Sequence, residues 1–154
     1  MLKYYNSIQD YYGDKRANRS GVPYIKHIDD GLRILEELNA DYYTKEAYCL
    51  HPIFQSDQDL LKNIHLIDRI DSGIMTLVME YRSVANEYLS KRKIVSIDEI
   101  RLSPLIEVNK MLLADKLQNF SDFILYHYGT HERSDELYIY FSYRKSCYGS
   151  SIRN

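Results

Sequence analysis

Apolar residues along this chain recur three and four positions apart in several separate runs, the spacing that places side chains on one face of an α-helix. The clearest run lies between residues 71 and 92, where eight apolar or aromatic positions keep this spacing. The helices expected from the pattern cover residues 2–17, 27–39, 41–51, 57–64, 71–92, 104–126 and 136–145. The pattern therefore predicts an all-α chain, folded as a compact helical bundle with one domain over residues 1–154.

Residues with capping or breaking chemistry mark the ends of these runs. Asp41 and Ser103 are expected N-caps, because their side-chain oxygens accept hydrogen bonds from the free N–H groups at a helix start. Pro52 falls inside a helical run, where a proline removes a backbone hydrogen bond at a cost of roughly 3 kcal/mol. The helix that carries His51 is therefore expected to end or kink there. Residues 137–141 are also strand-like in composition, but no other segment offers a partner strand, so a helix is preferred.

Composition excludes several classes of protein. The net charge of −2 over 154 residues gives no support to bulk nucleic-acid binding. No apolar run approaches the length of a membrane span or resembles a signal peptide. Cys49 and Cys147 lack a metal-like spacing, and Cys49 lies in an apolar stretch, so a reducing, cytoplasmic location is expected. The sixteen tyrosines suit interfaces and ligand pockets, although codon bias in an AT-rich genome is the favoured explanation of their number.

A short loop before the second predicted helix combines a glycine, a proline, basic residues and a histidine. Its string Arg-Ser-Gly-Val-Pro-Tyr-Ile-Lys-His, residues 19–27, resembles the entry signature of HD-type hydrolase domains of the RelA/SpoT kind, the guanosine tetraphosphate hydrolases. Two later segments follow in the order of that family. Residues 47–51 stand where the family has its second histidine, and residues 112–119 resemble its Leu-Ala-Asp-Lys-Leu-x-Asn segment. The resemblance covers about residues 18–125 and implies an HD-domain-like helical bundle.

The resemblance also implies a metal centre, in which imidazole and carboxylate ligands hold Mn²⁺ or a similar divalent ion that activates water. The ligands that carry over are His27, His51 and Asp115. Other acidic positions of the family are lost, because Pro52 replaces the aspartate of the His-Asp pair, and Gln55 and Ser56 replace a Glu-Asp pair. Proline offers no ligand, and an amide cannot exchange a proton as a carboxylate does. No catalytic residue is therefore assigned, no cofactor is required, and a metal is expected only if the residual trio is functional.

The positions that lie near the nucleotide in the family match this sequence better than the family's acidic positions do. The residues expected near a phosphorylated nucleotide are Arg19, Tyr24, Lys26, Lys116 and Asn119. An arginine suits bidentate contact with phosphate, and the two lysines would add positive charge. Each also has a plainer interpretation: core packing for Tyr24, a helix-to-loop hydrogen bond for Asn119, and solvated lysines.

Three hypotheses about function follow. The first is a catalytically degenerate HD-like domain that binds a signalling nucleotide without turnover, as a sensor or sequestering protein. A Tyr-, Asn- and Ile-rich chain of this kind would suit a phage protein that acts on host nucleotide signalling. The second is a metal-dependent phosphohydrolase that recruits Asp57 or Asp59 as the missing carboxylate. The third is a module that binds a protein, such as a host protein, through its tyrosines.

Overall fold

The computed structural model describes residues 2–18, 20–89, 99–130 and 134–153, which form seven α-helices and one 3₁₀ helix. The elements are α1 (Tyr5–Tyr12), α2 (Ile25–Glu37), α3 (Tyr42–Phe54), α4 (Asp57–Asn63), η1 (Ile64–Arg69), α5 (Ser72–Leu89), α6 (Ile106–Tyr126) and α7 (Ser134–Arg153). The described residues contain no β-strand, so the all-α bundle expected from the sequence is confirmed. Within the same residues, no helix has the length and apolarity that a bilayer crossing requires.

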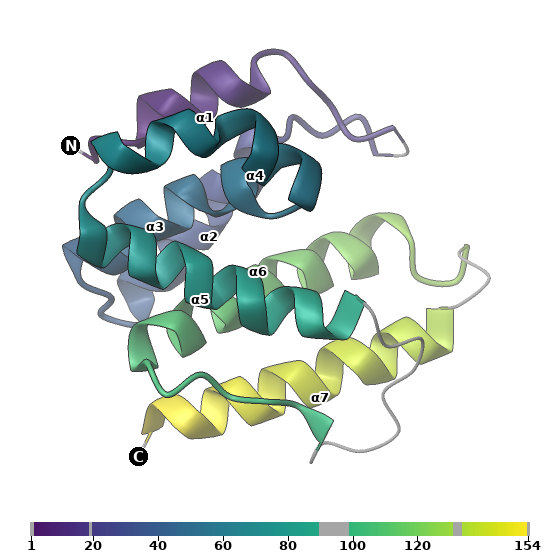
Figure 1. The fold of residues 1–154 in the computed structure, drawn as a ribbon. Helices are drawn as coiled ribbons and strands as arrows, with labels where there is room; N and C mark the ends of the chain where they lie inside the picture. The colour runs from purple at the N-terminus through teal and green to yellow at the C-terminus, as the bar shows by residue number, and fades with distance from the viewer. Residues whose placement is uncertain (1, 19, 90–98, 131–133, 154) are drawn as a thin grey trace.

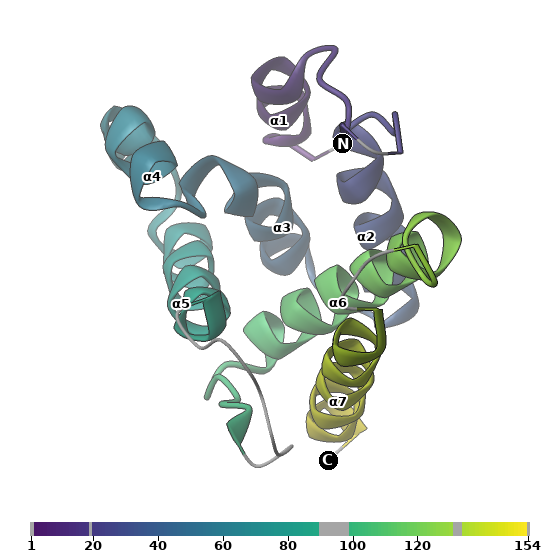
Figure 2. The ribbon, with the colours of Figure 1, turned by 90° about the vertical axis from the view of Figure 1, so that its right-hand side faces the viewer.

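Helix α3 lies at the centre of the bundle. It packs against α1, α2, α4, α5 and α6, and the two views show these helices arranged around it (Figures 1 and 2). Helix α6 lies between α2 and α7 in the turned view, and it packs against both (Figure 2). Residues of α2, α3 and α6 are therefore brought together from distant parts of the chain.

One of the two expected helix caps is confirmed. The side chain of Asp41 accepts a hydrogen bond from the Thr44 N–H at 2.8 Å, as predicted for the start of α3. The expected cap at Ser103 is wrong, because α6 begins at Ile106 and its N-cap is Leu105, which makes no side-chain cap hydrogen bond. Ser103 Oγ instead accepts from the Leu105 N–H at 3.1 Å, in the turn before the helix.

The first and last helices differ from the expected ranges. Helix α1 is shorter than predicted and ends at Gly13, whose φ of 51° lies in the left-handed region that favours glycine. Helix α7 is longer than predicted and runs to Arg153, past the expected end at Lys145. The strand-like composition of residues 137–141 is overridden here by packing of α7 along α6.

Pro52 does not end its helix. Helix α3 continues through it to Phe54, so the expected alternative of an end at His51 is wrong. Proline has no N–H to donate to the carbonyl of Tyr48, four residues earlier. That carbonyl instead lies 2.6 Å from Nδ1 of His51. The histidine therefore provides the hydrogen bond that the proline cannot.

Helices α2 and α3 approach closely at a glycine. Gly31 is buried in α2, and a Cβ atom built at this position would lie 2.1 Å from the hydroxyl oxygen of Tyr48. The Tyr48 side chain is completely buried. The missing side chain of Gly31 therefore leaves the space that the Tyr48 ring fills.

Candidate metal and ligand site

The structure brings together the three side chains that the sequence suggested as metal ligands. His27 comes from α2, His51 from α3 and Asp115 from α6. One ring nitrogen of each histidine and one carboxylate oxygen of Asp115 lie within 4.8 Å of one another. His51 and Asp115 are buried, whereas the side chain of His27 keeps 22% of its surface exposed. The group is therefore a largely buried cluster with one accessible edge.

Hydrogen bonds fix the orientation of the His51 ring. The carbonyl oxygen of Tyr48 can only accept, so the Nδ1 that lies 2.6 Å away carries the proton. Nε2 of His51 then has a free lone pair. Histidine ligands in metal sites are commonly held in this way, with one ring nitrogen donating to a carbonyl while the other is offered to the metal.

Gln118 fixes the second histidine in the same manner. Its Nε2 donates to Asp122 at 2.7 Å, which identifies the other amide atom as oxygen. That oxygen lies 2.5 Å from Nδ1 of His27, and it accepts the proton of this nitrogen. Nε2 of His27 faces Asp115 Oδ1 at 3.3 Å. Gln118 was not singled out in the sequence because it stands at the variable position of the late motif.

The three side chains fit a divalent metal by their chemistry. Two imidazole nitrogens and one carboxylate oxygen form a donor set that suits Mn²⁺, Fe²⁺ or a similar ion. Both histidines already have Nδ1 engaged with a carbonyl oxygen, so each offers only Nε2. His27, His51 and Asp115 would therefore be the residues that hold such an ion, with further positions open to an oxygen ligand.

Charges in this cluster shift the pKa values of its members. Burial lowers the pKa of His27, but the hydrogen bond and charge of Asp115 outweigh it, so this pKa lies above its ordinary value. Burial, followed by the charge of His27, lowers the pKa of His51 to about 3. Burial raises the pKa of Asp115, but Lys116 and the histidines hold it well below its usual range. Lys116 Nζ lies 2.5 Å from Asp115 Oδ2, and this carboxylate raises the lysine pKa against the opposing effect of burial.

Two buried tyrosines pack on the His51 ring. The ring centroid of Tyr48 lies 4.7 Å from that of His51, and the centroid of Tyr81 lies 4.8 Å away. Burial, followed by the charge of Asp115, raises the pKa of Tyr81 well above its ordinary value, which keeps this hydroxyl protonated beside the carboxylate. Tyr81 lies in the periodic apolar run between residues 71 and 92, and nothing in that run marks it as part of a site. Its position is set by the docking of α5 on α3, which no local pattern reveals.

A hollow of about 250 Å³ opens beside His51. It is lined by Tyr11, Tyr12, Lys15, Tyr24, His51, Pro52, Gln55 and Asp59. Tyr12 and Tyr24 meet edge to face, with ring centroids 5.5 Å apart. Tyr11, Tyr12 and Lys15 come from α1 or from the residues just after it. This part of the chain lies before residue 18, where the resemblance to the HD-type domains begins. Tyr24 thus lines the same hollow as His51, one of the three candidate metal ligands.

The other residues expected near a nucleotide lie in different surroundings. Lys26 is exposed and pairs with Asp30 one turn later in α2. Asn119 lines a separate hollow of about 370 Å³, which it shares with Ser20 and residues of α6 and α7. Lys116 contacts Asp115 rather than either hollow. Arg19 lies outside the described residues.

Asp57 and Asp59, the two candidates for the missing carboxylate, lie in different surroundings. Asp57 pairs with Arg82 and is not among the residues that line the hollow beside His51, whereas Asp59 lines that hollow. Asp59 accepts hydrogen bonds from the hydroxyls of Tyr11 at 2.6 Å and Ser56 at 2.5 Å. Burial raises the pKa of Asp59, but these two hydroxyls outweigh it, and the pKa lies below its ordinary value.

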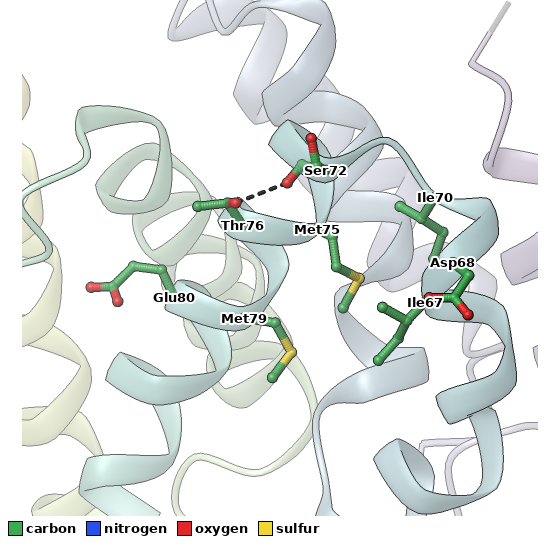
Figure 3. Close-up of a pocket in the computed structure, with 8 residues that line it drawn as sticks. All are labelled: Ile67, Asp68, Ile70, Ser72, Met75, Thr76, Met79 and Glu80. Carbon is green, nitrogen blue, oxygen red and sulfur yellow. Dashed lines mark hydrogen bonds between the residues drawn. The ribbon is translucent and has the colours of Figure 1, made fainter.

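A larger hollow, of about 690 Å³, lies away from these residues between η1 and α5 (Figure 3). Ile67, Ile70, Met75 and Met79 form its apolar surface, and the Thr76 hydroxyl is turned back to its own helix (Figure 3). Its lining brings no cluster of ligating groups together. The volume alone therefore does not mark it as the functional site.

Comparisons with known proteins supply no relative for this chain. No protein-family model, no curated protein and no solved structure matches it. The likeness to HD-type domains consequently remains a resemblance of short motifs.

Proposed function

We propose that this protein is a degenerate HD-like domain that binds a phosphorylated nucleotide beside a divalent metal and does not hydrolyse it. The metal would be held by His27, His51 and Asp115. The nucleotide would occupy the hollow beside His51, where Tyr24 and Lys15 contact it. The protein would then act as a sensor or a sequestering protein for a signalling nucleotide.

One observation carries this proposal: both histidines have Nδ1 engaged with a carbonyl oxygen and offer Nε2 beside Asp115. A buried histidine that only packs in a core also needs a partner for its N–H group, but here one nitrogen of each ring also lies within 4.8 Å of the other ring's nitrogen and of an Asp115 oxygen. The adjoining hollow supports the ligand class, because tyrosine rings stack on bases and a lysine attracts phosphate.

The absence of turnover is supported by the residues that line this hollow. Pro52 and Gln55 stand where the resemblance places acidic residues, and neither can accept a proton from water. Asp59 is engaged by two hydroxyls, which lower its pKa and make it a weaker base. Hydrolysis by the family's chemistry is therefore not expected.

A thermal-shift panel tests the proposal. Guanosine tetraphosphate, cyclic nucleotides and plain nucleotides are each added with and without Mn²⁺. A ligand that binds only the folded state stabilises it by about 2.7 kcal/mol at a hundred times Kd. We expect one phosphorylated nucleotide to raise the melting temperature and to be recovered intact by chromatography. His51→Ala should abolish the shift, whereas His65→Ala, an exposed histidine outside the site, should not.

The second candidate function is a metal-dependent phosphohydrolase, favoured by the position of Asp59 in the same hollow as His51. Consumption of the nucleotide in the presence of Mn²⁺, lost in Asp59→Asn, would establish it and contradict the binder. No shift with any nucleotide would contradict both. The protein-binding hypothesis would then remain, supported by the exposed Tyr126, Tyr128 and Tyr138 where α6 and α7 meet.

A further inference from the structure

The charge of Asp115 is already balanced by Lys116 without a metal. Lys116 Nζ lies 2.5 Å from Asp115 Oδ2, and their side chains are only 14% and 7% exposed. One ammonium and one carboxylate make this pair neutral. His27 and His51 would be neutral as metal ligands, so they would add no charge to a loaded site. A divalent ion that joined the group would therefore add two positive charges beside a lysine.

Movement of the Lys116 side chain away from Asp115 is unfavourable. It lies on α6, the helix that α7 packs against, and the Arg144 guanidinium of α7 repels its ammonium. Movement away from Asp115 would leave a charged lysine buried without its partner, which is strongly unfavourable. The carboxylates of Asp59 and Asp122 are held by hydrogen bonds from Tyr11 and from Gln118, and among the described residues neither forms an ion pair with Lys116.

An anionic ligand would restore the balance. A dianionic oxyanion, such as the terminal phosphate of a phosphate monoester, cancels the two added charges. The hollow beside His51 is open to such a ligand and is lined by Lys15 and by the tyrosines Tyr12 and Tyr24, whose hydroxyls can donate. A monoanion would cancel only one of the two positive charges that the metal adds.

We propose that Lys116 makes this centre bind a divalent metal and a dianionic oxyanion together, and makes the metal alone bind weakly. The inference rests on the proposed function, because it assumes the metal ligands His27, His51 and Asp115. It adds that the recognised group is the phosphate itself. By thermodynamic linkage, each of the two ligands raises the affinity for the other by the same factor.

The test is a titration of untagged protein with Mn²⁺, in which electron paramagnetic resonance measures the free ion. Titrations are made in phosphate and in nitrate at equal ionic strength, with protein-free blanks to correct for complexes in solution. We expect the apparent Kd for Mn²⁺ to be about tenfold lower in phosphate, within the usual range of coupling between two sites. Lys116→Met should bind Mn²⁺ in nitrate about tenfold more tightly than the natural protein and lose most of the phosphate effect.

Lys45→Met is the matched control, because Lys45 forms an ion pair with Glu36 on the outside of the bundle. It should keep the phosphate effect, as should Lys116→Arg, which keeps the charge. Equal Mn²⁺ affinity in phosphate and nitrate would overturn the inference while leaving the proposed metal site intact. No Mn²⁺ binding by any variant in either salt would overturn both. If Lys116→Met does not fold, the comparison of the two salts on the natural protein decides the question.

Discussion

Single residues decide how the histidines of the candidate site are presented. The motif resemblance identified His27, His51 and Asp115 in the sequence, because their spacing matches a family pattern. It did not identify Gln118, which holds His27, or the Tyr48 carbonyl, which holds His51. Every residue has a backbone carbonyl, so the residue type at position 48 does not reveal a hydrogen bond to that group. The sequence therefore predicts candidate ligands better than it predicts the groups that orient them.

Position 52 offers a direct test of the degenerate site. Pro52→Asp would place a carboxylate beside His51 in the hollow, so we expect Mn²⁺ affinity to rise by about tenfold through the additional charged ligand. Pro52→Asn is the matched control, since it also restores an N–H at this position but adds no charge. Equal affinities for the two variants, measured by the same titration, would show that position 52 does not face the metal.

Gly31 should tolerate no side chain. A Cβ there would lie 2.1 Å from the Tyr48 hydroxyl and 2.3 Å from its ring, so Gly31→Ala should lower the free energy of unfolding by roughly 2 kcal/mol. Gly149→Ala, also in a helix, meets no atom within 4 Å and should instead raise it by about 0.5–1 kcal/mol. Urea denaturation of both variants checks the pair. A stable Gly31→Ala variant would mean that the Tyr48 ring can move.

At the scale of elements, the periodic runs predicted most helices but not their contacts. The described lengths of α2, α3, α4, α5 and α6 follow the expected ranges within a few residues. Helix α1 was predicted too long, because Gly13 ends it, and its role in the site was missed entirely. The tyrosines of α1 line the hollow only because the helix docks against α3. Docking depends on residues far apart in the chain, which periodicity does not register.

A buried carboxylate fastens α1 to α3. Glu46 is fully buried and accepts hydrogen bonds from the backbone N–H groups of Lys3 and, at 2.9 Å, Tyr4. Glu46→Gln would replace one accepting oxygen with an amide nitrogen and leave an N–H unsatisfied. We expect a loss of about 2–3 kcal/mol in the free energy of unfolding.

Thermal or urea unfolding measures this loss, and exposed Glu37→Gln on α2 serves as the control. The control should change stability by no more than about 0.5 kcal/mol. Because α1 carries Tyr11 and Tyr12, Glu46→Gln should also weaken the binding of a nucleotide in the hollow. A variant with unchanged stability would show that the N-terminal helix is held by its apolar contacts alone.

For the whole molecule, the candidate centre joins three helices that are far apart in sequence. His27, His51 and Asp115 stand on α2, α3 and α6, so a bound ion would tie the middle of the bundle together. Mn²⁺ with phosphate should therefore slow amide hydrogen exchange in these three helices, and EDTA should reverse the effect. The 3₁₀ helix η1, which contributes no residue to the three ligands or to the hollow beside His51, provides the internal reference. Equal protection of η1 would indicate a general effect of salt.

The bond between His27 and Gln118 has a consequence for the order in which the protein folds. It joins residues 91 positions apart, and closing a loop of that length costs about 4 kcal/mol of chain entropy by the (3/2)RT ln n relation. Helices and neighbouring helix pairs form faster than such distant contacts. The oriented histidine is therefore a product of the last folding steps. A collapsed intermediate would already be helical yet unable to take up Mn²⁺, so metal uptake in a refolding experiment should lag behind the recovery of circular dichroism.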